Sequence, residues 1–219
     1  MTEDKLSAAK SGDECSVLER LLRRRGVLLG KQPEVEREII ERYQDDCAVL
    51  VLDSSGFTRV TKKHGIVHFL SLVVAMRDIC RPLFEAHEAI SHWPHCDNMF
   101  AVFPTARQAV RCAVAIQEGV RAENEKRPPE SRLEVCIGVG SGRLLRIGTE
   151  DVYGDEMNVA SKLGEDVAEP GEILLTRAAF EEISNKVDGL RTEMLTTHIS
   201  GVEIPYYSMD TASALTWKI

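Results

Sequence analysis

A continuous apolar run, CAVLVL, constrains the fold more than any other part of this 219-residue chain. It has the length of a strand and no polar alternation, which is typical of a strand buried on both faces. The residue that follows the run is Asp53, so a carboxylate leaves the sheet at the end of its most buried strand. The sequence therefore predicts a layered fold in which a central strand, 47–53, carries an acidic group to its edge.

Helical and strand patterns follow this strand in alternation. The apolar spacing over 65–87 predicts a helix in which Pro82 introduces a kink or a break. The segment 91–103 predicts two strands joined by a turn at its Pro-His-Cys-Asp-Asn cluster. A regular Ala/Val/Ile stripe over 105–123 predicts another helix, with Thr105 as its N-cap.

The second half of the chain adds further elements of both kinds. We expect a strand over 132–142 and a neighbouring return strand in RLLRIG, then a helix over 155–167, a strand over 172–175, a helix over 177–185, and a strand pair around 190–197 and 203–209. The leading order of strand, helix, strand, strand, helix, strand is that of an α+β, ferredoxin-like βαββαβ fold. In that fold, helices cover one face of a mainly antiparallel sheet, here with extra strands at the C-terminal end.

Composition is that of an ordinary globular protein, with 43% hydrophobic and 28% charged residues. The net charge of −8 disfavours nucleic acid as a partner. The longest apolar stretches fall short of the roughly 20 residues that span a bilayer, and the first residues lack a signal-peptide pattern, so we expect a cytoplasmic protein without membrane contact. Six cysteines show no CxxC spacing; we expect Cys47, Cys112 and Cys136 in the core and no disulfides.

The N-terminal segment, residues 1–45, is polar and then strongly basic at ERLLRRRG. Its residues 1–32 fit either a short helix with a solvated face or a docking or regulatory arm. Pro33 suits a first helical turn, and apolar spacing over 34–44 predicts a helix that leads into the main domain. We expect that domain to span 46–210, followed by a tail at 211–219.

Two carboxylates carry the first functional signal. The predicted topology places Asp53 and Asp97 at the ends of neighbouring strands, where a pair of carboxylates suits two Mg²⁺ or Mn²⁺ ions and a polyphosphate. Taken singly, Asp53 is also compatible with a turn cap and Asp97 with an Asx-turn. The intervening SSGFT segment places Gly56 near a helix start, where backbone N–H groups and the helix dipole favour phosphate.

Five motifs occur in a telling order: DxxGFT, DNxFAVF, IGVxSGR, DVYGDxxNxASKL and PGEILLT. In this combination the chain resembles the catalytic domain of class III nucleotidyl cyclases, the adenylate and guanylate cyclase family. The resemblance covers roughly residues 46–209. It implies conversion of a nucleoside triphosphate, ATP above all, to a 3′,5′-cyclic nucleotide and pyrophosphate, in cyclic-nucleotide signalling and with two Mg²⁺ or Mn²⁺ ions.

The resemblance also implies a role for individual residues. Asp53 and Asp97 match the metal-binding aspartates, and Asp151 matches a residue that reads the base in adenylate cyclases. Asn158 matches the asparagine that orients the ribose, and Lys162 stands on the arginine that stabilises the transition state. The remaining nucleotide-binding positions implied are Ser54, Gly56, Phe57, Thr58, Trp93 and Arg143. Asn158 and Lys162, at i and i+4, share one helix face, which fits a common ligand.

Four positions depart from the family pattern. Trp93 replaces a base-reading lysine, so it either contacts the base by stacking or is a packed aromatic at a strand edge. Cys96 replaces a glycine before the metal aspartate, Lys162 keeps the charge of an arginine but loses its planar fork, and Ser200 replaces a lysine directed at the γ-phosphate. These departures leave adenine preference and full activity open.

Three readings of function therefore compete. The first is an active cyclase, which the resemblance implies to be a head-to-tail homodimer with metal aspartates from one subunit and the Asn158–Lys162 pair from the other. The second is a weakened homologue that binds nucleotide, or another protein, as a regulatory module, or a cyclase with another base preference. The third is a sheet-based interaction domain, which leaves the paired carboxylates unexplained.

Overall fold

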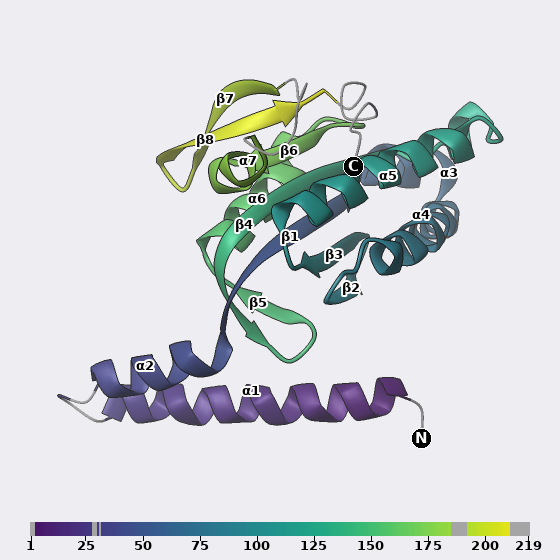
Figure 1. Ribbon diagram of the computed structural model, residues 1–219. Helices are drawn as coiled ribbons and strands as arrows, with labels where there is room; N and C mark the ends of the chain where they lie inside the picture. The colour runs from purple at the N-terminus through teal and green to yellow at the C-terminus, as the bar shows by residue number, and fades with distance from the viewer. Residues whose placement is uncertain (1–2, 28–29, 31, 185–191, 211–219) are drawn as a thin grey trace.

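The computed structural model describes residues 3–27, 30, 32–184 and 192–210, with side chains described from Asp13 onward. Within these residues, one open mixed sheet of eight strands carries helices on both faces (Figure 1). The strands are β1 (Gln44–Ser54), β2 (Ser91–His95), β3 (Asn98–Phe103), β4 (Val135–Ile147), β5 (Asp151–Tyr153), β6 (Ile173–Thr176), β7 (Thr192–Ile199) and β8 (Val202–Met209). The predicted tail at 211–219 and the first residues of the predicted strand at 190–197 lie outside the described residues.

Most of the helices lie at the predicted positions, and the helix at Phe57–His64 is an additional one before that predicted over 65–87. Their bounds are α1 (Glu3–Val27), α2 (Gln32–Tyr43), α3 (Phe57–His64), α4 (Ile66–Ala86), α5 (Ala106–Asn124), α6 (Asp155–Lys162) and α7 (Arg177–Ser184), and a π-helical turn at Leu163–Val167 continues α6. Thr105 caps α5 as predicted, since its hydroxyl accepts a hydrogen bond from the Gln108 backbone N–H at 3.3 Å. Pro82 does not break α4, which continues to Ala86.

The sheet confirms the predicted α+β class and its leading βαββαβ order. Its strand order is β2-β3-β1-β4-β6-β8-β7, with β5 paired to β4 alone. All described pairings are antiparallel except that of β4 with β6. β1 lies between β3 and β4, so the apolar run seen in the sequence is the buried central strand.

One face of the sheet carries the main core. Leu50 and Leu52 of β1 point to this side, where α4, α5 and α7 cover them. Buried members of this cluster from the three helices include Phe69, Met76, Phe84, Ala109, Ile116 and Ile183. Burial of these large side chains supplies most of the driving force for closing this layer.

The opposite face is also partly covered, which corrects the prediction that helices occupy only one face. Val49 and Val51 alternate with the first set and pack with Leu144 of β4 and Ala160 of α6. α6 approaches so closely because β4 offers glycine: a Cβ at Gly138 would lie 2.1 Å from the carbonyl oxygen of Ala160. Helix α6, which carries Asn158 and Lys162, therefore packs directly against the sheet.

β4 is longer than predicted. It runs from Val135 to Ile147, so the RLLRIG segment continues the strand and does not return beside it. The return strand is the short β5, whose Asp151 pairs with Ile147. The apolar residues of RLLRIG allow this extension because Leu144 and Ile147 are buried on packing against other elements.

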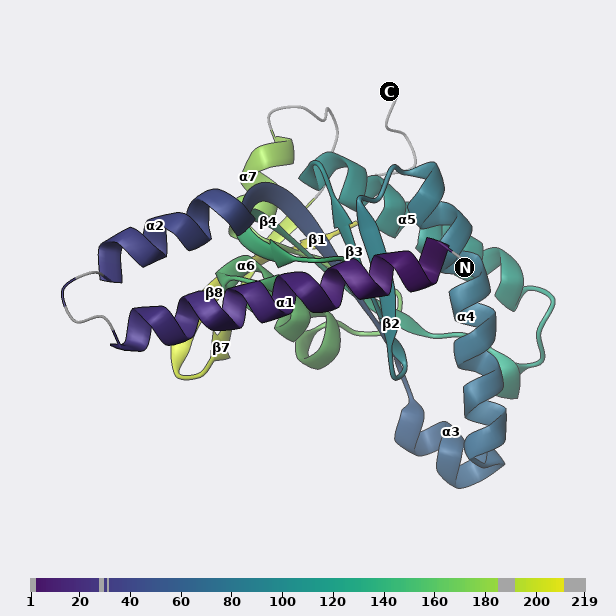
Figure 2. The same ribbon diagram turned by 90° about the horizontal axis from the view of Figure 1, so that it is seen from below.

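The N-terminal segment folds as a helical hairpin, with α1 and α2 side by side (Figure 2). α1 is a helix of 25 residues, longer than the short helix predicted, and its described residues after Leu21 are exposed up to Val27, which agrees with the predicted solvated face. Leu21 itself packs with Val35 and Ile39 of α2 and with Ile147 at the end of β4. The hairpin is therefore attached to the sheet at the β4–β5 end.

No helix in the described part of the chain is long and apolar enough to cross a membrane. The cysteines are free, and Cys47, Cys112 and Cys136 are buried as predicted.

Candidate active site

Asp53 and Asp97 meet at one end of the central strands. Leu52 pairs with Met99 across β1 and β3, so the next residue on β1 and the turn before β3 lie at the same end of the sheet. The contact is direct at the neighbouring residue, because the Ser54 hydroxyl donates a hydrogen bond to Asp97 Oδ2 at 3.3 Å. The structure thus brings together the two carboxylates that are 44 positions apart in the sequence.

The electrostatics of this end are unfavourable for negative charge. Burial, together with the nearby charge of Asp97, raises the pKa of the Asp53 carboxyl from 3.8 to about 7, while a backbone hydrogen bond at Ser54 opposes the shift. A carboxyl in such a place favours either a proton or a cation. The donor set is acid oxygens alone, which suits hard divalent ions.

The turn that carries Asp97 is conformationally demanding. Cys96 adopts φ +52, the left-handed region that glycine occupies most easily. Its carbonyl accepts a hydrogen bond from the Arg77 guanidinium of α4, which fixes the turn against that helix. The turn therefore contains a non-glycine residue in a strained backbone conformation, as the replacement of glycine by Cys96 predicted. The hydrogen bond from Arg77 of α4 holds this turn in place.

The segment after Asp53 forms the start of α3. The Ser55 N–H donates to the Glu134 carbonyl at 2.8 Å, and Gly56 reaches φ +88 as the residue before the helix. The first N–H groups of a helix have no partner within it, so those of Phe57 and Thr58 are available to an anion. Phe57 anchors the turn by packing edge-on to Phe69, with ring centroids 4.9 Å apart.

A third carboxylate, Glu165, lies beside the pair and was not predicted. It accepts a hydrogen bond from Asn98 Nδ2 at 3.1 Å, and its charge adds to the shift of the pKa of Asp53. Burial raises the pKa of Glu165 itself. The sequence shows that residue 165 is acidic but not where its side chain lies, because the π-helical turn after Lys162 determines its direction.

Asn158 and Lys162 lie on α6 as the helical spacing predicted. Asn158 is exposed, and Lys162 donates a hydrogen bond within an ion pair to Asp166 at 2.8 Å. This hydrogen bond raises the pKa of Lys162, so the side chain carries a positive charge over the whole physiological range. The cation is present, but within this chain it is paired with a carboxylate four residues further on.

Asp151 lies far from Asp53 in the same chain. Asp53 pairs with Cys136 near the start of β4, whereas Asp151 pairs with Ile147 at its end. These two positions are roughly 35 Å apart along a strand that rises about 3.3 Å per residue. One chain therefore cannot direct both carboxylates at one nucleotide.

Two other predicted residues, Arg143 and Trp93, do not join the aspartate pair. Arg143 is exposed and, by alternation along β4, shares the face of Ser141, whose hydroxyl donates to Glu182 of α7. That face is opposite to the one of Asp53. Trp93 is only 9% exposed and stacks on Phe100 with centroids 5.5 Å apart, which is the packed-aromatic arrangement.

The described residues offer no alternative metal cluster. No group of three or more His, Cys, Asp or Glu side chains among them is arranged to hold an ion. A cavity of about 470 Å³ lies between the end of α5 and the start of β4, with Gln117 and Arg132 in its lining. It includes none of the predicted site residues.

Curated proteins and solved structures that are similar to this chain include adenylate and guanylate cyclases. No protein-family model matches the chain. "Putative adenylate cyclase 3" of Rhizobium meliloti (strain 1021) is 26% identical over 141 residues, which are 64% of this chain and 24% of that protein. The chain thus spans about a quarter of the length of this curated relative.

Solved structures align over most of their own length. The adenylate/guanylate cyclase/hydrolase from Silicibacter pomeroyi aligns with a TM-score of 0.66 and 24% identity, over 76% of this chain and 96% of that one. The adenylyl cyclase CyaB from P. aeruginosa aligns with a TM-score of 0.65 and 18% identity, over 76% of this chain and 94% of its own. The chain has the cyclase catalytic-domain fold. The sequence resemblance to adenylate and guanylate cyclases is therefore confirmed at the level of fold.

On this fold the predicted site residues form two separate groups. One group, Asp53 and Asp97 with the start of α3, lies at one end of β1. The other, Asp151 and Asn158, lies along β5 and α6. The roles of these residues in a reaction remain predictions.

Proposed function

We propose that this chain is a nucleotidyl cyclase domain that converts a nucleoside triphosphate, with ATP as the favoured substrate, to its 3′,5′-cyclic nucleotide and pyrophosphate. The observation that carries the proposal is the pair Asp53 and Asp97, which meets at the end of β1 on a cyclase fold. The name of the Rhizobium meliloti relative supports an adenylate cyclase.

Asp53 and Asp97 are the residues that would hold Mg²⁺ or Mn²⁺. The fit rests on their mutual repulsion and on the raised pKa of Asp53, since a bound cation relieves both. Two such ions, when bound, supply positive charge to the triphosphate and to the attacking oxygen. The N–H groups at the start of α3 would contact phosphate oxygens at the same end of the strand.

The second group of residues would bind the nucleoside and the reacting phosphate. Asn158 would orient the ribose so that its 3′ oxygen faces the α-phosphorus, and Lys162 would place its charge where negative charge accumulates. The 3′ hydroxyl would release its proton to solvent water as its oxygen forms a bond to the α-phosphorus, and the bond from that phosphorus to the leaving pyrophosphate would break. Lys162 reaches the phosphate only after it leaves Asp166, because the two side chains are paired here.

A complete site would need two copies of the chain. Asp151 and Asp53 stand at opposite ends of β4, so a head-to-tail homodimer joins the metal group of one copy to the base and ribose group of the other. Arg143 and Trp93 are left outside this site, because the first faces the other side of the sheet and the second is packed on Phe100.

A second candidate is a weakened cyclase homologue that binds nucleotide as a regulatory module. The Lys162–Asp166 ion pair favours it, since the one cation proposed to act on the phosphate is already neutralised. The buried Trp93 favours it too, because a packed indole replaces a cationic base reader.

The decisive experiment is a product assay. The purified protein is incubated separately with ATP, GTP, CTP and UTP in the presence of Mn²⁺, and the products are identified by mass spectrometry. The proposal expects a 3′,5′-cyclic nucleotide and pyrophosphate, with ATP the best substrate. Bound nucleotide without any cyclic product would favour the regulatory module instead.

Mixing of inactive variants tests the shared site. Asp53→Ala and Asn158→Ala are each expected to be inactive, but a mixture contains heterodimers with one intact site, so about a quarter of the wild-type sites return if subunits exchange freely. Mixing Asp53→Ala with Asp97→Ala is the matched control, because both defects lie in the same half and no site is restored. Recovery in both mixtures, or in neither, would contradict the proposed dimer.

A further inference from the structure

The N-terminal hairpin touches one residue of the proposed site. The Cys15 thiol of α1 donates a hydrogen bond to Asp151 Oδ2 at 3.0 Å, in a partly buried contact between residues 136 positions apart. Asp151 is the residue proposed to read the base, and β5, which carries it, is a short strand paired only to β4. A contact from α1 is therefore a main restraint on this carboxylate.

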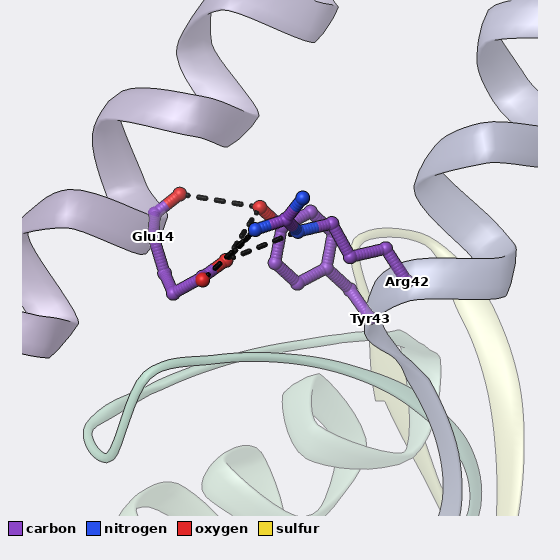
Figure 3. A network of polar contacts seen from close by, with 3 residues as sticks. All are labelled: Glu14, Arg42 and Tyr43. Atoms are coloured by element: carbon purple, nitrogen blue, oxygen red, sulfur yellow. Dashed lines mark hydrogen bonds and ion pairs between the residues drawn. The ribbon is translucent and has the colours of Figure 1, made fainter.

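A polar network one residue earlier fixes the position of α1. Glu14 accepts two hydrogen bonds from Arg42 Nη2 at 2.9 and 3.0 Å, and one from the Tyr43 hydroxyl at 3.0 Å (Figure 3). Arg42 and the buried Tyr43 end α2, and β1 begins at the next residue. Cys15 therefore stands on a helix that is clamped to the entry of the central strand.

Apolar packing fixes the same part of α1 to the end of β4. Leu21 is buried with Tyr43 and Ile147, and Leu18 and Leu145 pack against them. Because Ile147 pairs with Asp151, this cluster lies next to the Cys15 contact. The thiol is thus held beside the carboxylate by elements on both sides.

In this hydrogen bond the thiol is the donor and the carboxylate is the acceptor. The hydrogen bond to Asp151, followed by burial, raises the pKa of the Cys15 thiol, so the thiol stays protonated and donates. Asp151 also raises the pKa of Tyr153, two residues along the same strand, which places that phenol within the field of the carboxylate. One carboxylate oxygen is occupied by the thiol, and the other can accept a further hydrogen bond.

We propose that Cys15 is a positioning residue that orients Asp151 to accept a hydrogen bond from the exocyclic amine of adenine. Guanine carries a carbonyl acceptor at the corresponding position, which a carboxylate repels. The inference rests on the proposed function and extends it, because it makes the N-terminal hairpin a determinant of base choice.

The test compares donor and non-donor variants in the full chain. Dissociation constants for ATP and GTP are measured by competition against a fluorescent nucleoside triphosphate, alongside the rates of cyclic product formation. Cys15→Ala removes the donor and is expected to lower the ATP-over-GTP preference about fivefold, as for a hydrogen bond to a charged acceptor that acts indirectly. Cys15→Ser keeps a donor and is expected to stay within about twofold of the wild type. Arg23→Gln, on the exposed side of α1, is the matched control.

A separate measurement checks the contact without nucleotide. The rate of Cys15 alkylation by N-ethylmaleimide is followed by mass spectrometry of the peptide that contains it, and Asp151→Asn should accelerate it because the negative charge is removed. An unchanged alkylation rate would overturn the inference whatever the cyclase assay gives. An equal loss of ATP and GTP affinity in Cys15→Ala would also overturn it, since that is the result of a structural role.

The same data separate this inference from the proposed function. A wild type that makes no cyclic product but prefers ATP, with the preference reduced in Cys15→Ala, refutes the enzyme and supports the role of Cys15. A wild type that binds neither nucleotide refutes both.

Discussion

Asp53 and Asp97 are held in place by the core of the sheet, whereas Asn158 and Lys162 stand on a short helix whose polar side faces solvent. Asp53 follows strand residues that are buried on both faces. Because its carboxyl is itself partly buried, its pKa is raised to about 7. Lys162 is 44% exposed and satisfies its charge with Asp166 on its own helix. The Asp53–Asp97 group is therefore buried beside the core and electrostatically strained, and the Asn158–Lys162 group is solvent-facing with its cation already paired.

The largest expected effect is at the Asp53–Asp97 group. Asp53→Ala should reduce cyclase activity by about 10³-fold or more, since the proposed ions lose one of the two carboxylates that would hold them at the triphosphate. The measurement is the initial rate of cyclic nucleotide formation in Mn²⁺. Asp46→Ala, an exposed carboxylate at the start of the same strand, is the control and should retain the wild-type rate. Residual activity within tenfold of wild type would refute the metal assignment.

A smaller effect is expected at the paired cation. Lys162→Ala should lower kcat by about 10²-fold, in the range found when one group that stabilises transition-state charge is removed. Lys162→Arg should keep the activity or raise it by up to about tenfold, because a guanidinium grips phosphate oxygens with two hydrogen bonds. Equal rates for the Ala variant and the wild type would show that this helix face does not contact the reacting phosphate.

The strain at Asp53 predicts a stability effect with a defined pH dependence. Its folded pKa of about 7 lies above the ordinary 3.8, so the folded state loses stability from this group as pH rises between the two values. Asp53→Asn removes the loss, so without metal its melting temperature should exceed that of the wild type by about 2 °C or more at pH 8. The group is only partly buried, and solvent screening keeps this gain modest.

The measurement is thermal unfolding in EDTA at pH 5, 6, 7 and 8. The advantage of Asp53→Asn should grow with pH over this series, while Asp46→Asn should show no such trend. A difference that is constant with pH would mean that the carboxyl of Asp53 titrates normally in the folded protein.

The smallest expected effect is at Asp166. Asp166→Asn frees Lys162, and because an exposed ion pair contributes little free energy, kcat/KM should rise by no more than about fivefold. Glu181→Gln breaks the equivalent i, i+4 pair with Arg177 on α7 and is the matched control. A fall in kcat/KM for Asp166→Asn would show that the pair positions Lys162 and does not restrain it.

Local patterns predicted the elements well where one periodicity dominated. The apolar run before Asp53 became the central strand, and the stripe after Thr105 became α5 with the predicted cap. The RLLRIG segment was misread because its apolar residues suit either a new strand or the continuation of one. Only packing of Leu144 and Ile147 against other elements selects the continuous β4.

The site was predicted in the same uneven way. The pairing of β1 with β3 follows from the topology, so the meeting of Asp53 and Asp97 was accessible from the sequence. Glu165 was not, because a π-helical turn rotates it away from the position that regular helical spacing gives. Arg143 was placed with the triphosphate by its motif, while strand alternation puts it on the other face of the sheet.

The sequence by itself determined most of the strands and helices, that two carboxylates end neighbouring strands, and that the chain resembles a cyclase domain. These features depend on periodicity and on short motifs, which are local properties of the chain. The tertiary structure decided that α6 covers the second face of the sheet, that Asp151 lies far from Asp53, and that Cys15 holds Asp151. Such contacts depend on close packing between distant segments, as at Gly138 against Ala160, and no local pattern encodes them.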